Sequence, residues 1–253
     1  MAPVKRKSAT PPARAQKAPA QEAPPQRASK ATAAQEAPRL SRAEKAAMTR
    51  RRMLDAAYAE LCEQGFRATT MDAVAQRAGV AVQTLYFTFH TKDALLQEVL
   101  DWAVLGDEQL VPPQQPWFKQ AVGEPGVVDA VAAMVAGIET VLARVAPLIP
   151  VFHAVAADPA GKVYRHSEQL RRDGYADLVD ILSAKADRRA GLSRARAIDL
   201  VFVLLGPELY RSLVIDCGWS PTEYTDWATA TILHDLFGQD PPPPRRRGPS
   251  RRR

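Results

Sequence analysis

The chain has few of the residues that build metal centres and disulfide frameworks. Its two cysteines, Cys62 and Cys217, lie far apart, and its four histidines form no metal-binding pattern with them. Such sites need closely spaced or more numerous ligands. We therefore expect no metal, no disulfide and a reducing, cytoplasmic environment. Cys62 shares an apolar stripe with Leu54 and Leu61, which favours a small core residue over a redox sensor.

Motifs that carry enzymatic chemistry are absent as well. The sequence has no Gly-rich phosphate loop and no nucleophile motif, so we expect no catalytic residue and no cofactor. No stretch is expected to be long and apolar enough to span a bilayer, so we predict no membrane partner. The N-terminus is basic and rich in Pro and Ala, without the apolar segment of a secretory signal.

Charge is unevenly distributed along the chain. Residues 1–40 carry a net charge of +6, and residues 241–253 carry another +6. Residues 41–92 carry +3, whereas residues 93–240 carry −9. Because phosphate attracts Lys and Arg and repels an acidic surface, this polarity favours DNA contact through the first part of the chain and through both ends.

Both ends have the composition of disordered tails. Residues 1–40 consist mainly of Ala, Pro, Lys, Arg and Gln, and residues 241–253 combine Pro with six arginines. Such segments bury too little apolar surface to fold. The tails either add sequence-independent phosphate contacts through counterion release or serve only as solubilising ends, and the sequence favours neither reading.

The most informative stretch runs from Thr69 to Lys92 and reads TTMDAVAQRAGVAVQTLYFTFHTK. Thr70 predicts the N-cap of a helix that Gly79 ends. A second short helix is expected from Val80 and Ala81, with a fresh cap at Thr91 for the helix after it. Two short helices around a glycine turn make a helix-turn-helix, whose second helix fits the major groove of DNA. The same pattern also fits an ordinary corner between two helices.

The second helix carries side chains suited to reading base edges. Gln83 can bond adenine in a bidentate way, and Thr84 can reach a base or a phosphate. Val82 and Phe87 suit the methyl groups of thymine. Three further residues suit phosphate contacts, which position a protein without reading sequence: Thr70, Tyr86 and Lys92.

The run GVAVQTLYFTFHTKDALL, residues 79–96, resembles the recognition segment of the TetR family of bacterial repressors, which has a GVSxxTLYxxFxxKxxL-like signature. The preceding AAYAELCEQGFRATTMDAVA resembles the first helix of that family and its link to the second. Val82 and Phe87 depart from the family pattern, which often has polar or basic residues there, so the resemblance predicts no operator sequence. The stretch GPELYRSLVIDCGWSP, residues 206–221, resembles the ends of actinobacterial-type members.

The resemblance implies an all-α homodimer. An N-terminal three-helix helix-turn-helix domain is followed by a helical ligand-binding and dimerisation domain, and the last two helices pack against their copies. On this basis we predict four parts: a disordered basic tail (residues 1–40), a DNA-binding domain (41–92), an effector-binding and dimerisation domain (93–240) and a disordered Arg/Pro tail (241–253).

Helical periodicity and caps predict the remaining elements. The expected helices run from about Arg42 to Gln64, from Val127 to Val145, from Tyr164 to Arg189 with Leu170 facing inward, from Ser193 to Cys217 and from Ser220 to about Phe237. Arg50, Arg51 and Arg52 lie either beside DNA phosphates or on a solvated face. Val111–Pro125 is expected to be irregular, with Trp117 and Phe118 as a plug of the domain edge rather than a lid over a pocket.

Six residues of the second domain are candidates for an effector pocket: Met134, Phe152, His153, Tyr164, His166 and Phe202. An ordinary apolar core and structural histidines explain the same residues. We therefore predict a cytoplasmic, nucleoid-associated transcriptional regulator that binds a palindromic operator in double-stranded DNA. Its expected mode is repression released by a small-molecule effector. Competing classes are a sequence-indifferent DNA-compacting protein, for which the tails would do the binding, and an effector-binding domain with a non-functional reader.

Overall fold

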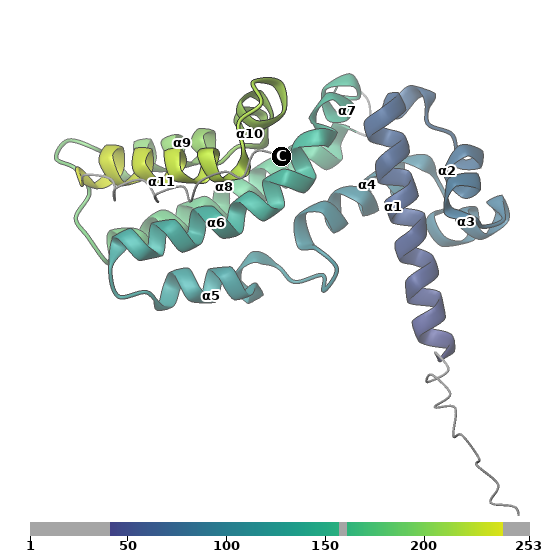
Figure 1. Ribbon diagram of the computed structural model, residues 1–253, viewed down its shortest axis with the longest axis horizontal. Helices are drawn as coiled ribbons and strands as arrows, with labels where there is room; N and C mark the ends of the chain where they lie inside the picture. Colours follow the sequence, from purple (N-terminus) through teal and green to yellow (C-terminus); the bar gives the residue numbers. More distant parts are fainter. Residues whose placement is uncertain (1–40, 157–160, 240–253) are drawn as a thin grey trace, which may run out of the picture. The chain divides into compact units, whose positions relative to one another are not determined.

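The computed structural model describes residues 41–156 and 161–239, apart from the side chain of Val163 (Figure 1). The chain divides into two units, residues 1–40 and residues 41–253, and only the second contains described residues. The predicted tails, residues 1–40 and 241–253, lie outside the described residues. Every regular element in the described ranges is helical, which agrees with the predicted all-α class.

The elements follow one another in a simple order. The first four are α1 (Arg42–Ala68), α2 (Met71–Ala78), α3 (Val82–Phe89) and α4 (Lys92–Leu105). Next come η1 (Pro112–Gln114), α5 (Pro116–Gly123), α6 (Val127–Val145), η2 (Ala146–Leu148) and α7 (Ile149–Ala154). The last group is α8 (Gly161–Ser183), α9 (Arg194–Leu204), α10 (Pro207–Tyr210), the π-helical η3 (Arg211–Asp216) and α11 (Pro221–Phe237).

Two apolar cores hold these helices. The first, which we call the reader core, joins α1–α4 to the C-terminal end of α6, to η2 and to α7. The second, the body core, joins α5, α6 and the helices from α8 to α11. Helix α6 contributes to both cores and packs against α4, α5 and α11. The domain boundary predicted after residue 92 stays a prediction.

Short-range signals set the helix ends of the first four elements. The side chains of Thr70 and Thr91 accept hydrogen bonds from Ala73 N and Ala94 N, both at 3.1 Å, which confirms the two predicted caps. Gly79 ends α2 in a left-handed conformation with φ 66°, also as predicted. Gly65, with φ 74°, interrupts α1 where the sequence predicted its end, and one further turn follows.

Helix α6 corrects one expectation. Helix α6 has the predicted bounds. Together with η2 and α7 it forms the stretch Val127–Ala154, which is long and apolar enough to cross a membrane by length and composition, so the prediction that no such stretch exists is wrong. Its apolar residues line the interior, with Ala130, Val131, Met134 and Val135 fully buried in the body core. The apolar run therefore has the character of a core helix.

The segment Val111–Pro125 corrects a second expectation, because η1 and α5 form where an irregular loop was predicted. Pro116 stands at the first position of α5, where the missing N–H costs nothing. The ring of Trp117 covers Gly137 of α6 so closely that a Cβ added there would lie 2.2 Å from its Cγ. Trp117 and Phe118 pack against the body core, as expected for a plug, and Trp117 also lines a cavity described below.

The third correction concerns the helices of residues 161–217. Helix α8 runs from Gly161 to Ser183, earlier at both ends than predicted, and Leu170 is exposed rather than buried. The helix predicted to be continuous from Ser193 to Cys217 is broken after Leu204, where Gly206 and Pro207 start α10. The last helix confirms its predicted start, with a Ser220 capping box and Pro221 in the first turn.

Candidate DNA-binding site and effector pocket

Helix α3 is anchored on one side and open on the other. Leu85 and Phe89 are buried in the reader core, which fixes the rotation of the helix about its axis. The opposite face presents Gln83, Thr84 and Phe87, and the Phe87 side chain is 84% exposed. Residues three and four apart share one helix face, so Gln83, Thr84 and Phe87 form one continuous strip.

The other predicted DNA contacts have mixed surroundings. Tyr86 is 47% exposed, and its hydroxyl has no hydrogen-bond partner among the described residues. Thr70 is exposed and uses its oxygen as the α2 cap, which leaves its own proton free to donate. Val82 is half-buried and packs against the reader core. None of these placements tests DNA contact, so the assignments stay predictions.

Lys92 has an internal role that the sequence did not indicate. Its Nζ donates to Phe66 O at 2.7 Å and to Thr69 O at 3.0 Å, and it lies 4.3 Å from the centroid of the Phe66 ring. These contacts fasten the start of α4 to the end of α1. The remaining N–H of the ammonium is the one available to a phosphate.

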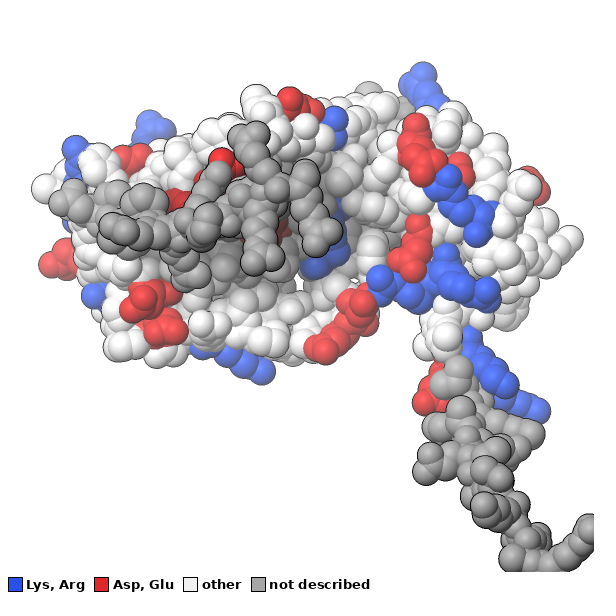
Figure 2. All heavy atoms as spheres, viewed as in Figure 1, with Lys and Arg blue, Asp and Glu red and all other residues white. Residues whose placement is uncertain are grey.

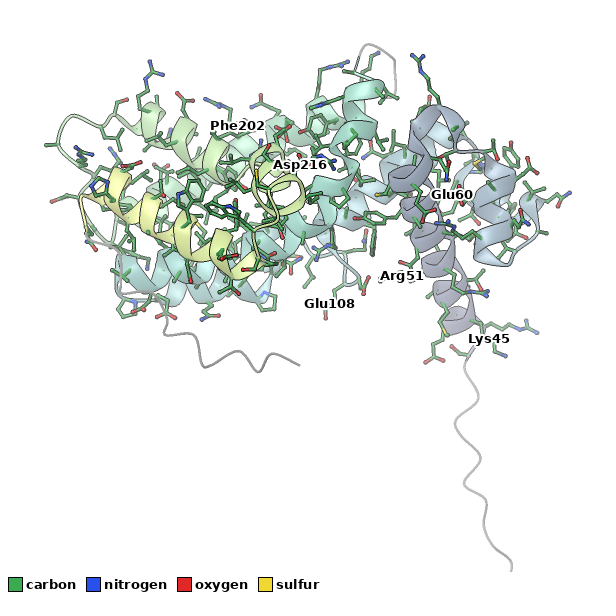
Figure 3. All side chains as sticks on the ribbon, turned by 45° about the horizontal axis from the view of Figure 1, so that its top comes forward. Lys45, Arg51, Glu60, Glu108, Phe202 and Asp216 are labelled. Carbon is green, nitrogen blue, oxygen red and sulfur yellow. The ribbon has the colours of Figure 1, made fainter. Side chains whose placement is uncertain are left out.

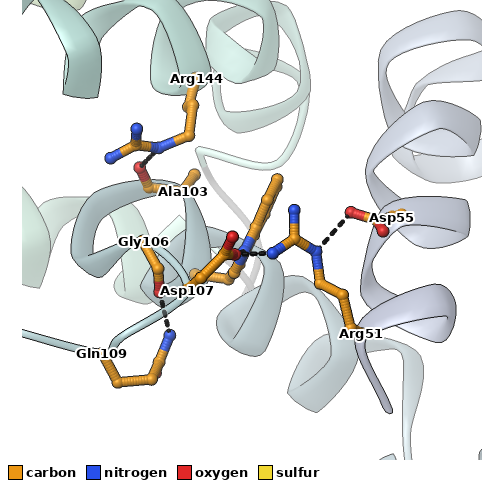
Figure 4. A network of polar contacts seen from close by, with 8 residues as sticks. Arg51, Asp55, Ala103, Gly106, Asp107, Gln109 and Arg144 are labelled. Atoms are coloured by element: carbon orange, nitrogen blue, oxygen red, sulfur yellow. Dashed lines mark hydrogen bonds and ion pairs between the residues drawn. The ribbon is translucent and has the colours of Figure 1, made fainter. Parts of the chain in front are cut away.

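The three consecutive arginines of α1 separate into two kinds. Arg50 pairs with Glu98 of α4, and Arg51 pairs with Asp55 and with Asp107, the latter just after α4 (Figure 4). The Arg51 guanidinium also lies 4.6 Å from the Trp102 ring. Arg50 and Arg51 therefore join α1 to α4, a role that the sequence did not indicate, and their position beside DNA phosphates stays a prediction. Arg52 is exposed and has no carboxylate partner among the described residues.

Helices α1, α4 and α6 also meet through backbone carbonyls. Tyr58 donates to Arg144 O at 3.0 Å. Arg144 Nε donates to Ala103 O at 2.8 Å (Figure 4). Burial raises the pKa of the Tyr58 phenol and lowers that of the Arg144 guanidinium. At neutral pH both groups keep the protonation states that these bonds need.

Exposed cations of α1 gather on its first turns. Residues 41–48 are all exposed, and Figure 3 shows Lys45 on this part of the helix. Arg42, Lys45 and Arg52 lie within one sector of the helix by their spacing, and Figure 2 shows basic side chains along α1. By contrast, Arg77 on α2 is held by Glu60 and Glu63, and its hydrogen bond lowers the pKa of Glu63.

The six predicted effector residues do not surround one cavity. Met134 is buried in the body core, whereas Phe152 is buried in the reader core and stacks on Tyr164 at a centroid distance of 4.8 Å. His153 and His166 are exposed. Only Phe202 lines the larger cavity described below. The effector assignment is not tested by this arrangement.

One cavity, about 400 Å³ in volume, opens between α8 and the break from α9 to α10. It is lined by Glu168, Arg171, Phe202, Val203, Gly206, Glu208, Leu209 and Ser212. This volume lies within the range of small-molecule sites. The sequence analysis missed these residues apart from Phe202, although the Gly206-Pro207 pair inside an apolar helix is a signal for a break.

A second, smaller cavity, about 270 Å³, lies between the end of α4, α5 and α6, and Trp117 is part of its wall. The described residues contain no group of three or more His, Cys, Asp or Glu side chains that could hold a metal ion. Cys62 is half-buried beside the reader core, and burial raises the pKa of its thiol. A raised pKa keeps the thiol protonated and unreactive.

Comparison with known proteins agrees with this architecture. A family model described as bacterial regulatory proteins of the tetR family matches residues 53–99. No curated protein matches the chain. Among solved structures, the MbdR regulator from Azoarcus sp. CIB is 18% identical with a TM-score of 0.57, and the match covers 75% of this chain and 99% of that one.

Two further structures show the same fold. NalD, described as the secondary repressor of the MexAB-OprM multidrug efflux pump in Pseudomonas aeruginosa, is 16% identical with a TM-score of 0.57, and the match covers 77% of this chain and 98% of that one. TylP, a tetR regulator from Streptomyces fradiae, is 22% identical with a TM-score of 0.55. The match covers 77% of this chain and 89% of that one. The matched family consists of regulators, not enzymes. The capped helix-turn-helix of α2 and α3 lies inside the residues that match the tetR-family model, and the described part of the chain has the fold of these solved regulators.

Proposed function

We propose that this protein is a transcriptional regulator of the TetR type, a repressor that binds a palindromic operator as a homodimer and is released by a small-molecule effector. The observation that carries the DNA-reading part is the face of α3, where Gln83, Thr84 and Phe87 are exposed while Leu85 and Phe89 hold the helix. Two such helices in successive major grooves would lie about 34–36 Å apart.

Gln83 supplies the polar base contact in this proposal, and Phe87 and Val82 supply apolar contacts with thymine methyl groups. Thr70, Tyr86 and Lys92 hold phosphates and set the orientation. Residues 41–92 form the DNA-binding domain and residues 93–240 the effector-binding and dimerisation domain. The GPELYRSLVIDCGWSP stretch supports dimerisation through the last two helices and a place among the actinobacterial-type members.

An effector releases the operator only if it binds more tightly to a state with wrongly spaced recognition helices. Residues 93–240 carry a net charge of −9, so DNA phosphate repels them. The basic parts of the chain are therefore the ones that contact DNA. We propose that the protein acts in the cytoplasm, associated with the nucleoid through DNA binding.

The test is selection from a fragmented genomic library in about 0.15 M salt, with sequencing of the retained DNA. We expect a few palindromic sites, lost in Gln83→Ala and kept in Gln120→Ala, an exposed glutamine of α5. Uniform retention that disappears when residues 1–40 and 241–253 are deleted would instead identify a sequence-indifferent DNA-compacting protein.

The tails are tested separately through salt dependence. If their cations contact phosphate, deletion of both tails flattens the slope of log affinity against log salt concentration for the selected operator. An unchanged slope means that the tails are solubilising ends.

A further inference from the structure

The break between α9 and α10 is surrounded by polar side chains that leave its carbonyl groups little free capacity. Tyr175 donates to Leu205 O at 2.8 Å and Tyr224 donates to Leu204 O at 2.7 Å. The amide of Gly206 donates to Val203 O at 3.1 Å. Because the last carbonyls of a helix need partners, these bonds make the break a stable feature of the fold rather than a frayed end.

Arg171 is the cation of the adjoining cavity, and it is already committed. Its guanidinium makes two bonds with Glu168, Nε to Oε1 at 3.0 Å and Nη2 to Oε2 at 2.5 Å. Nη1 donates to Phe202 O at 2.8 Å, and the guanidinium lies 3.7 Å from the centroid of the Phe202 ring. A bidentate pair of this kind neutralises both charges, so neither Arg171 nor Glu168 offers a free charge to a ligand.

Glu208 is different, because no cation pairs with it among the described residues. One of its carboxylate oxygens accepts a hydrogen bond from the Tyr164 hydroxyl, and the residue lines the cavity. Phe202, Val203 and Leu209 supply an apolar wall around it. A carboxylate accepts hydrogen bonds only, so the uncompensated group of this cavity suits a ligand that carries positive charge and N–H donors.

We propose that the cavity between α8 and the α9–α10 break binds an organic monocation, a protonated amine with an apolar or aromatic body, through the carboxylate of Glu208. The ammonium group donates to Glu208, and the apolar body packs on Phe202 and Leu209. The Ser212 hydroxyl, which donates to Glu208 O at 3.0 Å, keeps lone pairs for a second N–H of the ligand.

The Tyr164–Glu208 hydrogen bond also connects the cavity with the reader core. Tyr164, which donates to Glu208, stacks its ring on Phe152 with an interplanar angle of 9°. Phe152 is buried in the reader core together with residues of α1 and α4. An ammonium group that competes for Glu208 therefore weakens the Tyr164–Glu208 hydrogen bond. This bond holds the Tyr164 ring against Phe152 of the reader core. This regulatory half of the inference rests on the proposed function.

Binding is tested by ligand-observed NMR with three probes of similar size: phenethylamine, phenethyl alcohol and hydrocinnamate. We expect the amine to bind at least about tenfold more tightly than the alcohol and the carboxylate, as for a charge-assisted hydrogen bond. Glu208→Gln should remove this preference while it keeps an acceptor for Tyr164. Asp216→Asn is the matched control, because it also removes one carboxylate, whereas Asp216 pairs with Arg211 and is not part of the cavity lining.

Equal binding of the three probes, or an amine preference that survives Glu208→Gln, overturns the ligand assignment whatever the DNA experiments show. For the regulatory half, phenethylamine should lower the affinity for the selected operator in the natural protein. Tyr164→Phe should still bind the amine, but operator affinity should no longer respond. A response that persists in Tyr164→Phe contradicts the route through Phe152. If selection yields no operator, the proposed function fails, and the ligand assignment is still decided by the NMR comparison.

Discussion

The first four helices and the break between α9 and α10 satisfy their helix ends in different ways, although the body core also has local caps at Ser193 and Ser220. In the reader, Ser41, Thr70 and Thr91 each cap the helix that begins at the next residue. In the body, the carbonyls at the α9–α10 break are capped by Tyr175 and Tyr224, which are 30 and 20 residues away in sequence. Local caps fix a helix-turn-helix whose geometry must not change, whereas long-range caps allow a ligand to act on the contacts between helices.

The largest effect on stability is expected from Leu85→Ala in the reader core. Leu85 lies on the inner face of α3 and is fully buried, so its truncation should lower the free energy of unfolding by about 3 kcal/mol. Phe87→Ala, two residues along and mostly exposed, should change it by less than about 0.5 kcal/mol. Urea unfolding of both variants makes the comparison, and similar losses would mean that the burial of α3 is misassigned.

Gly137→Ala tests the packing of the body core. The added Cβ would clash with the ring of Trp117, so we expect a loss of about 1–3 kcal/mol from overpacking. Gly174→Ala is the matched control, because no atom lies within 4 Å of its added Cβ in helix α8. Alanine in that open helical position should stabilise by about 0.5–1 kcal/mol. Thermal unfolding should therefore shift in opposite directions in the two variants.

Tyr175→Phe removes one long-range cap. Tyr175 is buried, so the carbonyl of Leu205 loses its partner, and we expect a loss of about 1–3 kcal/mol. Tyr86→Phe, on the exposed face of α3, should leave stability unchanged within about 0.5 kcal/mol. An equal effect of both substitutions on urea unfolding would show that the break needs no capping tyrosine.

The smallest effect concerns Asp101 on α4. Burial raises the pKa of its carboxyl group, although Gln97 donates to it at 2.8 Å. The folded protein therefore binds this proton more tightly than the unfolded chain does, and stability falls as pH rises from the ordinary pKa through the raised one. Asp101→Asn lacks this loss, so it should be slightly more stable at neutral pH and no more stable in acid below both pKa values. Urea unfolding across that pH range measures the difference.

The reader could be predicted in detail because its signals are local. Thr70, Gly79 and Thr91 each act within four residues, so sequence spacing suffices to place the helix ends. The end of α3 is the exception, since His90 has φ 62°, a conformation that only a few per cent of residues other than glycine adopt. The roles of Arg50, Arg51 and Lys92 also depend on partners that only the folded α4 and α1 bring near.

The body was harder to predict for the same physical reason. The predicted start of α11 followed from Ser220-Pro221, but the prolines of Val111–Pro125 were interpreted as helix breakers although Pro116 begins α5. The cavity depends on Arg171, Glu208 and Phe202, which come from two segments and meet only in the tertiary structure. Sequence periodicity indicates which apolar residues face the interior, but it does not show which of them line the same cavity.

The central claim is that the exposed face of α3 reads DNA sequence. The most direct measurement is the ratio of affinities for a selected operator and for a permuted sequence of equal composition, in the natural protein and in Gln83→Ala. We predict a ratio of roughly a thousandfold or more in the natural protein and a reduction of about tenfold or more in the variant. A ratio near one in the natural protein, or an unchanged ratio in Gln83→Ala, Phe87→Ala and their double variant, would contradict the claim.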